Sequence, residues 1–140
     1  MLNIIIEASQ NFCIHQIREP HEVICNVYNM RTVIAYVDIT MNSGKKHRVF
    51  IGATPNFAQR VTTLLLEEDN SDEETLVDMV LELTNLIIGS AKVLAQNRPE
   101  YSYTMATPCF EKIDAFDIEY NEAKTIKVGN DEMIIAIKEI

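Results

Sequence analysis

The sequence predicts a single α+β domain, residues 1–140, in which an antiparallel β-sheet packs with a long helix and one or two shorter helices. Three observations support this prediction. Helix-like and strand-like segments are grouped along the chain instead of alternating, which favours an antiparallel sheet over βαβ units. Residues 72–97 repeat apolar side chains every three to four positions, as a helix does. Residues 125–128 and 133–137 flank Gly-Asn-Asp, which indicates a closing hairpin.

A short helix and a three-stranded meander are expected in the first part of the chain. Residues 4–17 space their apolar side chains three to five positions apart, which predicts a helix that ends before Pro20. Residues 22–40 are rich in Val, Ile and Tyr and alternate in the manner of two strands. An Asn-Ser-Gly turn then leads into residues 45–52, the third strand of the meander.

Two helices and a further strand are expected after the meander. Residues 54–55, Thr-Pro, are a hydroxyl N-cap followed by proline at the first helical position. Ser71 and Glu74 have the spacing of a capping box, which opens the long helix, and this helix ends before Pro99. Residues 101–106 alternate like a strand.

Charge and cysteine content exclude several classes of partner. The chain has 12 Lys and Arg against 21 Asp and Glu, a formal net charge of −9, so we expect neither nucleic acid nor a membrane surface as a partner. The three cysteines form no short-spaced pair, and we expect buried, reduced thiols in a cytoplasmic protein. From the sequence we expect neither a signal peptide nor a membrane-spanning segment, which would need a run of ~18 apolar residues.

The long helix carries two opposed stripes of side chains. The apolar stripe consists of Leu76, Val80, Leu83, Ile87, Ala91 and Leu94. The polar row opposite consists of Asp78, Glu82, Asn85, Gly89, Lys92 and Gln96. At 100° per residue each set spans about 80° of arc, so one faces the core and the other faces outward. Met79, Leu86 and Val93 border the polar row on one side, and Val77 and Ile88 border it on the other. Apolar borders of this kind indicate a surface that contacts another molecule.

Glu82 and Asn85 form the most informative pair in this row. They are three residues apart, so their side chains leave the same face with Cβ atoms about 5–6 Å apart. A carboxylate and an amide at that distance can act together on one external target. Glu-x-x-Asn alone is common on exposed helices, and the specificity comes from the surrounding sequence.

The segment from Asp78 to Lys92 resembles the signature helix of the CheC/CheX/FliY chemotaxis phosphatase family. The signature is an Asp or Ser, three residues, Glu, two residues, Asn, and then an apolar-Gly-small-Ala-Lys continuation, and every position is present. The Thr-Pro at residues 107–108 and the closing hairpin are also compatible with the family. The helix that starts at Pro55 has no Glu-x-x-Asn, so the chain is similar to the single-signature CheX type, whose members form homodimers.

The resemblance implies a phosphatase that removes the phosphoryl group from the phosphoaspartate of a CheY-type response regulator. Asn85 would then orient the attacking water, and Glu82 would pair with the active-site lysine of the regulator. The residues expected to contact the partner are Asp78, Met79, Leu86, Gly89 and Lys92. The chain itself would bind no cofactor, because the regulator supplies Mg²⁺ in its own active site.

Other functions fit the residues less well. A non-catalytic, motor-switch-like module that binds a response regulator or flagellar switch proteins would not need the intact pair of Glu82 and Asn85. A metal site is not expected, since Cys13 and His15 would share a face only in a strand and no third ligand is near them in the sequence. The acidic run Glu67–Glu74 fits a solvated loop, or a surface that steers a basic partner.

Overall fold

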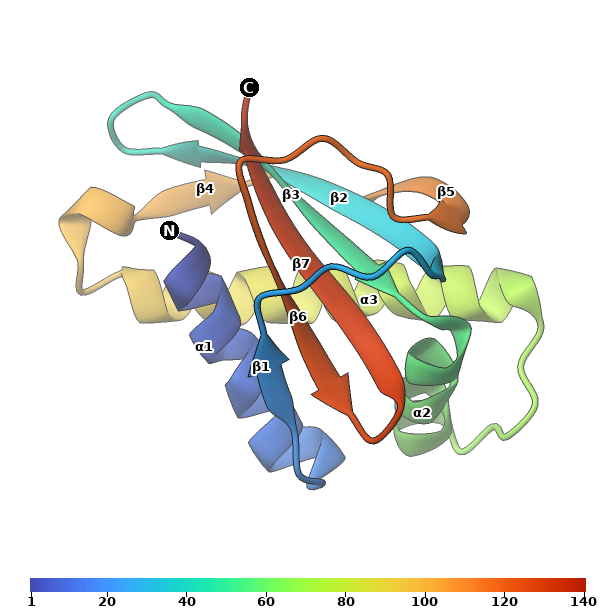
Figure 1. Ribbon diagram of the computed structural model, residues 1–140. Coiled ribbons are helices and arrows are strands. Elements are labelled where there is room, and N and C mark those ends of the chain that lie inside the picture. The colour runs from blue at the N-terminus through green and yellow to red at the C-terminus, as the bar shows by residue number, and fades with distance from the viewer.

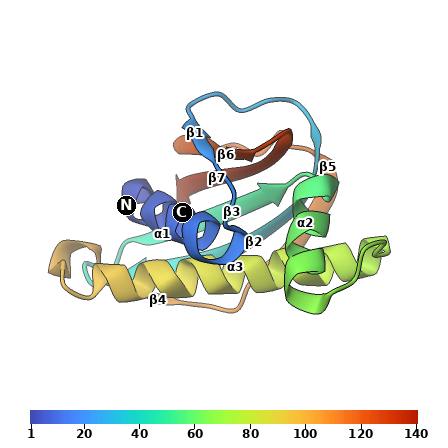
Figure 2. The ribbon, with the colours of Figure 1, turned by 90° about the horizontal axis from the view of Figure 1, so that it is seen from below.

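The computed structural model describes all 140 residues, and its three helices cover one face of a seven-stranded sheet (Figures 1 and 2). In chain order the elements are α1 (Leu2–Phe12), a π-helical segment η1 (Cys13–Ile17), β1 (Glu22–Ile24), β2 (Arg31–Met41), β3 (Lys46–Ala53), α2 (Pro55–Leu66), α3 (Glu73–Ala95), a 3₁₀ turn η2 (Pro99–Tyr101), β4 (Tyr103–Met105), β5 (Cys109–Ala115), β6 (Glu122–Val128) and β7 (Asp131–Glu139). The predicted α+β class is confirmed.

The sheet is antiparallel throughout, in the order β1-β6-β7-β3-β2-β4, with β5 also pairing with β2. The predicted meander is correct for β2 and β3, but β1 is not part of it. It lies at the opposite edge of the sheet, on β6, where Val23 packs against the core and Glu22 faces Lys127 across the ladder. The hydroxyl of Thr125 donates to the carbonyl of Asn26, 2.8 Å away, and holds the chain beyond β1 on the hairpin.

The connection between α2 and α3 fixes where the long helix begins. Thr54 caps α2 as predicted, but the cap of α3 is Asp72 and not Ser71. The Asp72 carboxylate accepts a hydrogen bond from the Thr75 N–H at 2.9 Å. The Thr75 hydroxyl and this N–H both stabilise the carboxylate, which lowers the pKa of Asp72. Ser71 instead donates its N–H to the side-chain oxygen of Gln59 at 2.9 Å. This bond ties the acidic connection to α2, while the Ser71 hydroxyl, which would have to accept the capping bond, has no hydrogen-bond partner.

The core lies between the helices and the inner face of the sheet, and α3 runs along it (Figure 2). Leu83, Ile87 and Ala91 from the predicted apolar stripe are buried there. The buried hydroxyl of Tyr103 on β4 donates to the carbonyl of Ile88 at 2.6 Å, which fixes the middle of α3 to the sheet. The opposite face of the sheet has a smaller cluster, formed by Ile34, Phe50, Phe116, Ile134 and Ala136.

The prediction of three buried thiols is wrong for two of them. All three cysteines are free, but only Cys13 is buried, while Cys25 and Cys109 are exposed. Cys25 follows the short edge strand β1, and Cys109 begins the outer strand β5, so neither has an element packed over it. Burial raises the pKa of the Cys13 thiol to about 11.

We expect a dithionitrobenzoate titration at pH 8 to separate these thiols. The thiolate is the reactive form, so Cys25 and Cys109 react rapidly in the folded protein, and Cys13 reacts only after denaturation. A Cys13→Ala variant provides the control, since it should lose the slow thiol alone. Equal reaction rates for all three thiols in the folded protein would contradict the burial of Cys13.

Candidate functional site on α3

The predicted polar row of α3 faces away from the core. Asp78, Glu82 and Asn85 are exposed, and Gly89 and Lys92 are half-buried. The hydrogen bonds that fix α3 are made by other groups, namely its Asp72 cap, its backbone carbonyls and the buried Thr84 hydroxyl. The side chains of Glu82 and Asn85 bind nothing within the chain and are available to another molecule.

Charges along this face run from acidic to basic. Asp78 and Glu82 are one helical turn apart, and neither has an ion-pair partner. The one ion pair of α3 joins its first residue, Glu73, to Arg31 on β2 over 3.9 Å and is exposed. Like charges four residues apart destabilise a helix by about 0.2–0.5 kcal/mol. A cation placed between the two carboxylates would relieve this repulsion, so the N-terminal half of the face favours a positively charged group. Lys92 lies at the other end.

Gly89 lies in the polar row without an internal reason for a glycine. A Cβ added at this position would meet no heavy atom within 4 Å, and the backbone there is ordinary right-handed helix. Glycine in a helix costs about 1 kcal/mol relative to alanine. Gly89 therefore lowers the stability of the helix without improving packing within the chain. This is expected where another molecule approaches the helix backbone closely.

Two of the predicted apolar borders belong to the core. Met79 is only 5% exposed and Ile88 is fully buried, because elements packed beside α3 cover both flanks. The prediction that Met79 contacts a partner is therefore wrong. Leu86 and Val93 are the exposed apolar side chains beside the polar row, at 39% and 62%.

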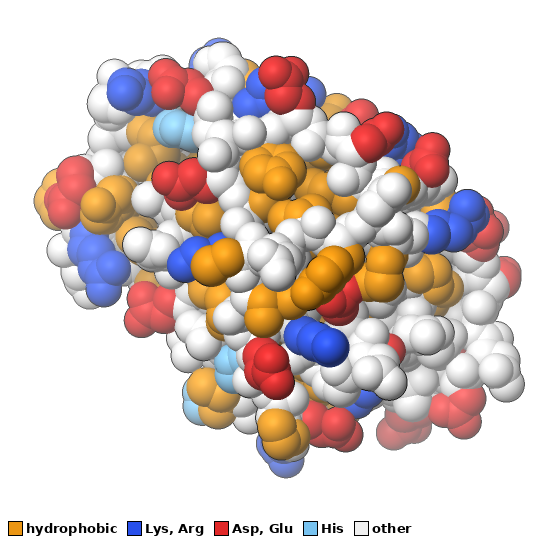
Figure 3. All heavy atoms as spheres, viewed as in Figure 1, with side chains coloured by type: hydrophobic (Ala, Val, Ile, Leu, Met, Phe, Trp, Pro, Cys, Tyr) orange, Lys and Arg blue, Asp and Glu red, His pale blue; other side chains and the backbone are white.

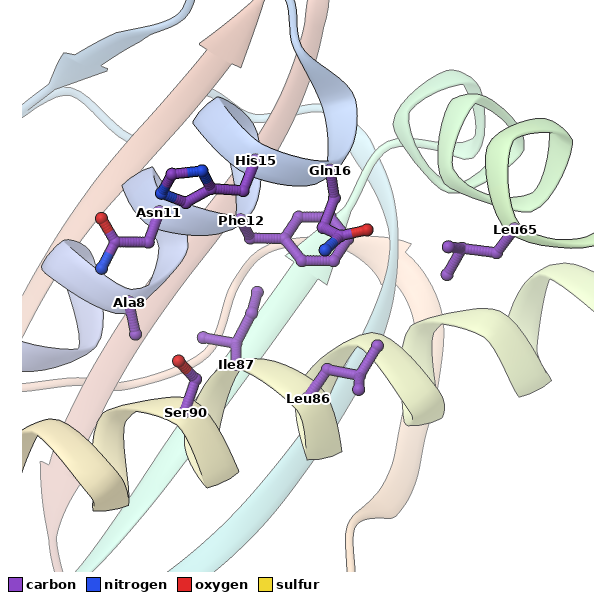
Figure 4. A pocket seen from close by; sticks show the side chains of 9 residues that line it. All are labelled: Ala8, Asn11, Phe12, His15, Gln16, Leu65, Leu86, Ile87 and Ser90. Carbon is purple, nitrogen blue, oxygen red and sulfur yellow. The ribbon is translucent and has the colours of Figure 1, made fainter.

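Sequence reasoning missed a groove next to Leu86. Its volume is about 410 Å³, and residues from α1, η1, α3 and the end of α2 line it (Figure 4). These elements are far apart in the sequence, so no local pattern indicates the groove. The one available signal was the three consecutive leucines at residues 64–66, which end α2 and are all exposed.

The structure contains no group of three or more His, Cys, Asp or Glu side chains arranged to hold a metal ion. None of its helices combines the length and the apolar character that crossing a membrane requires. A second hollow lies beside α2, where Arg60 is already paired with Glu19 and Asp131, each at 2.9 Å.

Comparison with known proteins relates the site to one family. A family model described as "Chemotaxis phosphatase CheX" matches residues 33–129, which include the whole of α3. None of the curated proteins matches the sequence significantly.

Several crystal structures share the fold at low sequence identity. Chemotaxis protein CheX from Vibrio vulnificus has a TM-score of 0.77 at 18% identity, covering 99% of this chain and 97% of that one. A CheX from Desulfovibrio desulfuricans has a TM-score of 0.74 at 21% identity, covering 99% and 97%. The CheX–CheY–BeF₃–Mg²⁺ complex from Borrelia burgdorferi gives 0.68 at 17% identity, also over 99% and 97%.

We expect Gly89→Ala to increase the free energy of unfolding by about 1 kcal/mol, because alanine fits the open space and favours the helix. Urea denaturation measures the change. Gly44→Ala is the matched control with the opposite sign, since Gly44 has φ +91°, which strains an alanine. Destabilisation by Gly89→Ala would mean that this chain, and not a partner, requires the glycine.

Proposed function

We propose, since this chain belongs to the chemotaxis phosphatase CheX family, that it hydrolyses the phosphoaspartate of a CheY-type response regulator. The observation that carries the proposal is the exposed, unpartnered pair of Glu82 and Asn85, one turn apart on α3 and within the segment that matches the family. The CheX–CheY complex among the structural matches supports a regulator as the partner.

The main task of the phosphatase in this reaction is to position the attacking water. Water attacks the phosphorus in line with the acyl oxygen, the P–O bond to the aspartate breaks, and the products are a free carboxylate and inorganic phosphate. The carboxylate is a good leaving group, so the barrier depends on holding the water and stabilising charge on the phosphoryl oxygens. Mg²⁺ bound in the regulator would supply the charge stabilisation, as the complex that contains Mg²⁺ suggests.

Asn85 has the functional group suited to orient the water. Its amide is neutral and cannot act as a base, but its carbonyl oxygen accepts a hydrogen bond from the water and so directs the lone pair at phosphorus. An exposed position in the middle of α3 allows this amide to enter a cleft in a partner. The rigid helix fixes its direction, which lowers the entropy lost on reaching the reactive geometry.

Glu82 has the position suited to anchor the helix. Its carboxylate is exposed, lacks a cation within the chain and is close to Asp78, so a lysine of the regulator would find an unshielded negative site. An ion pair there would set the register of α3 on the partner and thereby place Asn85, one turn away. Asp78, Gly89 and Lys92 extend the same face and would contact the surrounding surface.

Asn85→Ala is expected to slow regulator dephosphorylation by about 10²–10³-fold, which corresponds to about 3–4 kcal/mol, because the water loses its orientation. Binding to the BeF₃⁻-loaded regulator should remain nearly unchanged. Phosphate release from a phosphorylated, Mg²⁺-bound CheY-type regulator measures the rate. Gln96→Ala removes an exposed amide from the end of the same row and is the control. Wild-type turnover by Asn85→Ala would refute the assignment.

Glu82→Lys is expected to weaken both binding and turnover, because it places a cation opposite the lysine of the regulator. Glu74→Lys makes the same charge change two turns earlier on α3 and should have a much smaller effect. Titration of the variants with the BeF₃⁻-loaded regulator compares the affinities. Equal losses of affinity in the two variants would indicate a general electrostatic attraction instead of a specific ion pair between Glu82 and the lysine of the regulator.

The assay also separates the proposal from a motor-switch-like interaction module. A protein that binds the regulator through α3 without accelerating phosphate release would belong to that class, and Glu82 and Asn85 would then be contact residues alone.

We also propose that the chain forms a homodimer, as CheX-type members do. The outer strand β5 supports this, because it pairs only with β2 and carries the exposed Phe110, so its other edge can pair with a second chain. Light scattering should give a mass near twice 16.0 kDa. The mass of one chain at high concentration would rule the dimer out.

A further inference from the structure

The groove beside Leu86 has the features of a protein-binding site. Phe12 and Leu65 contribute apolar walls, and Ile87 and Leu86 on α3 contribute to its floor (Figure 4). Its polar lining groups, including His15 and Ser90, carry no fixed charge. An amide, an imidazole or a hydroxyl at the rim can bind the backbone of an incoming segment while its side chain enters the apolar part.

Exposed apolar side chains concentrate on the elements that form this groove. Of the ten large hydrophobic side chains that are exposed, six belong to η1, α2 and α3, namely Ile14, Leu64, Leu65, Leu66, Leu86 and Val93. Leu65 and Leu86 line the groove itself, and each is 39% exposed. These two side chains place exposed apolar surface beside the polar lining groups, as interaction sites on folded proteins do.

We infer that this groove is a second docking site for the response regulator and takes an apolar side chain that the regulator presents next to its phosphorylation site. The inference rests on the proposed function. It adds a specificity contact to that function, outside the polar row that carries Glu82 and Asn85.

Adjacency along α3 supports the regulator as the occupant. Leu86 directly follows Asn85, is exposed and lines the groove, so a partner surface that surrounds the Asn85 side chain lies next to the mouth of the groove. A specific interface also covers roughly 800 Å² per partner and involves about 20–30 residues on each side. The polar row of one helix is too small for this, and the groove continues the same surface with apolar area.

Acidic residues of this chain next to the groove indicate which charges the regulator should carry around the inserted side chain. Leu65 is followed within a few residues by Glu67, Glu68 and Asp69, and Gln59 and Thr63 hold this segment by hydrogen bonds of 2.8 and 2.9 Å to the Glu68 carbonyl. The acidic residues are therefore fixed near the end of α2. The matching surface of the regulator should carry Lys or Arg beside its apolar side chain.

Single substitutions in the groove test the inference. Leu65→Ser and Leu86→Ser should each weaken binding of a BeF₃⁻- and Mg²⁺-loaded CheY-type regulator about tenfold, as loss of apolar contact in a pocket does. Leu66→Ser is the matched control, since Leu66 is the adjacent leucine, is exposed and does not line the groove. It should keep the affinity within about twofold, as surface substitutions outside a contact do. Unchanged affinity for Leu65→Ser would overturn the inference.

Hydrogen exchange in the complex locates the contact directly. Binding should protect η1 and the last turn of α2 in addition to α3, and protection of α3 alone would overturn the inference. Leu65→Ser could instead convert a dimer to a monomer, as measured by light scattering, and leave the affinity for the regulator unchanged. In that case the groove binds a second copy of the chain, and the inference is also wrong. These binding measurements do not depend on hydrolysis. A regulator that binds in the groove but is not dephosphorylated would refute the proposed function and leave the docking site intact.

Discussion

Burial of one stripe of α3 against the sheet is the contact on which the arrangement of the site depends. Leu83, Ile87 and Ala91 fix the rotation of the helix about its axis, and the bond from Tyr103 to the Ile88 carbonyl fixes its position along the sheet. Once these are set, the pitch of the helix alone determines which residues face outward. The polar row is a consequence of core packing, and it needs no further support from neighbouring loops.

Because the buried stripe alone holds α3 in place, the side chains of the polar row do not need partners within the chain. A stabilising ion pair to Glu82 or a hydrogen bond to Asn85 would compete with the partner for the same groups. The structure leaves both free, keeps a helical glycine and tolerates exposed leucines at the end of α2. Each feature costs a little stability, and together they favour binding over stability at one face of the molecule.

Local patterns predicted the parts of the fold that depend on local chemistry. The Thr-Pro start of α2, the closing hairpin and the two faces of α3 follow from neighbouring residues, and the structure confirms them. The position of β1 was missed because its pairing with β6 joins residues about a hundred positions apart. Met79 was misplaced because helical periodicity gives a direction but does not indicate which neighbouring element covers it. The groove was missed for the same reason, since its walls come from three separate parts of the chain.

The location of the site on one uninterrupted helix has a consequence for how the sequence can vary in length. A residue inserted between Glu82 and Asn85 would rotate every later side chain by about 100° and turn the row toward the core. The same insertion in the connection before Asp72 would change only a loop that is exposed to solvent. Insertions and deletions should therefore be confined to the segments outside α3.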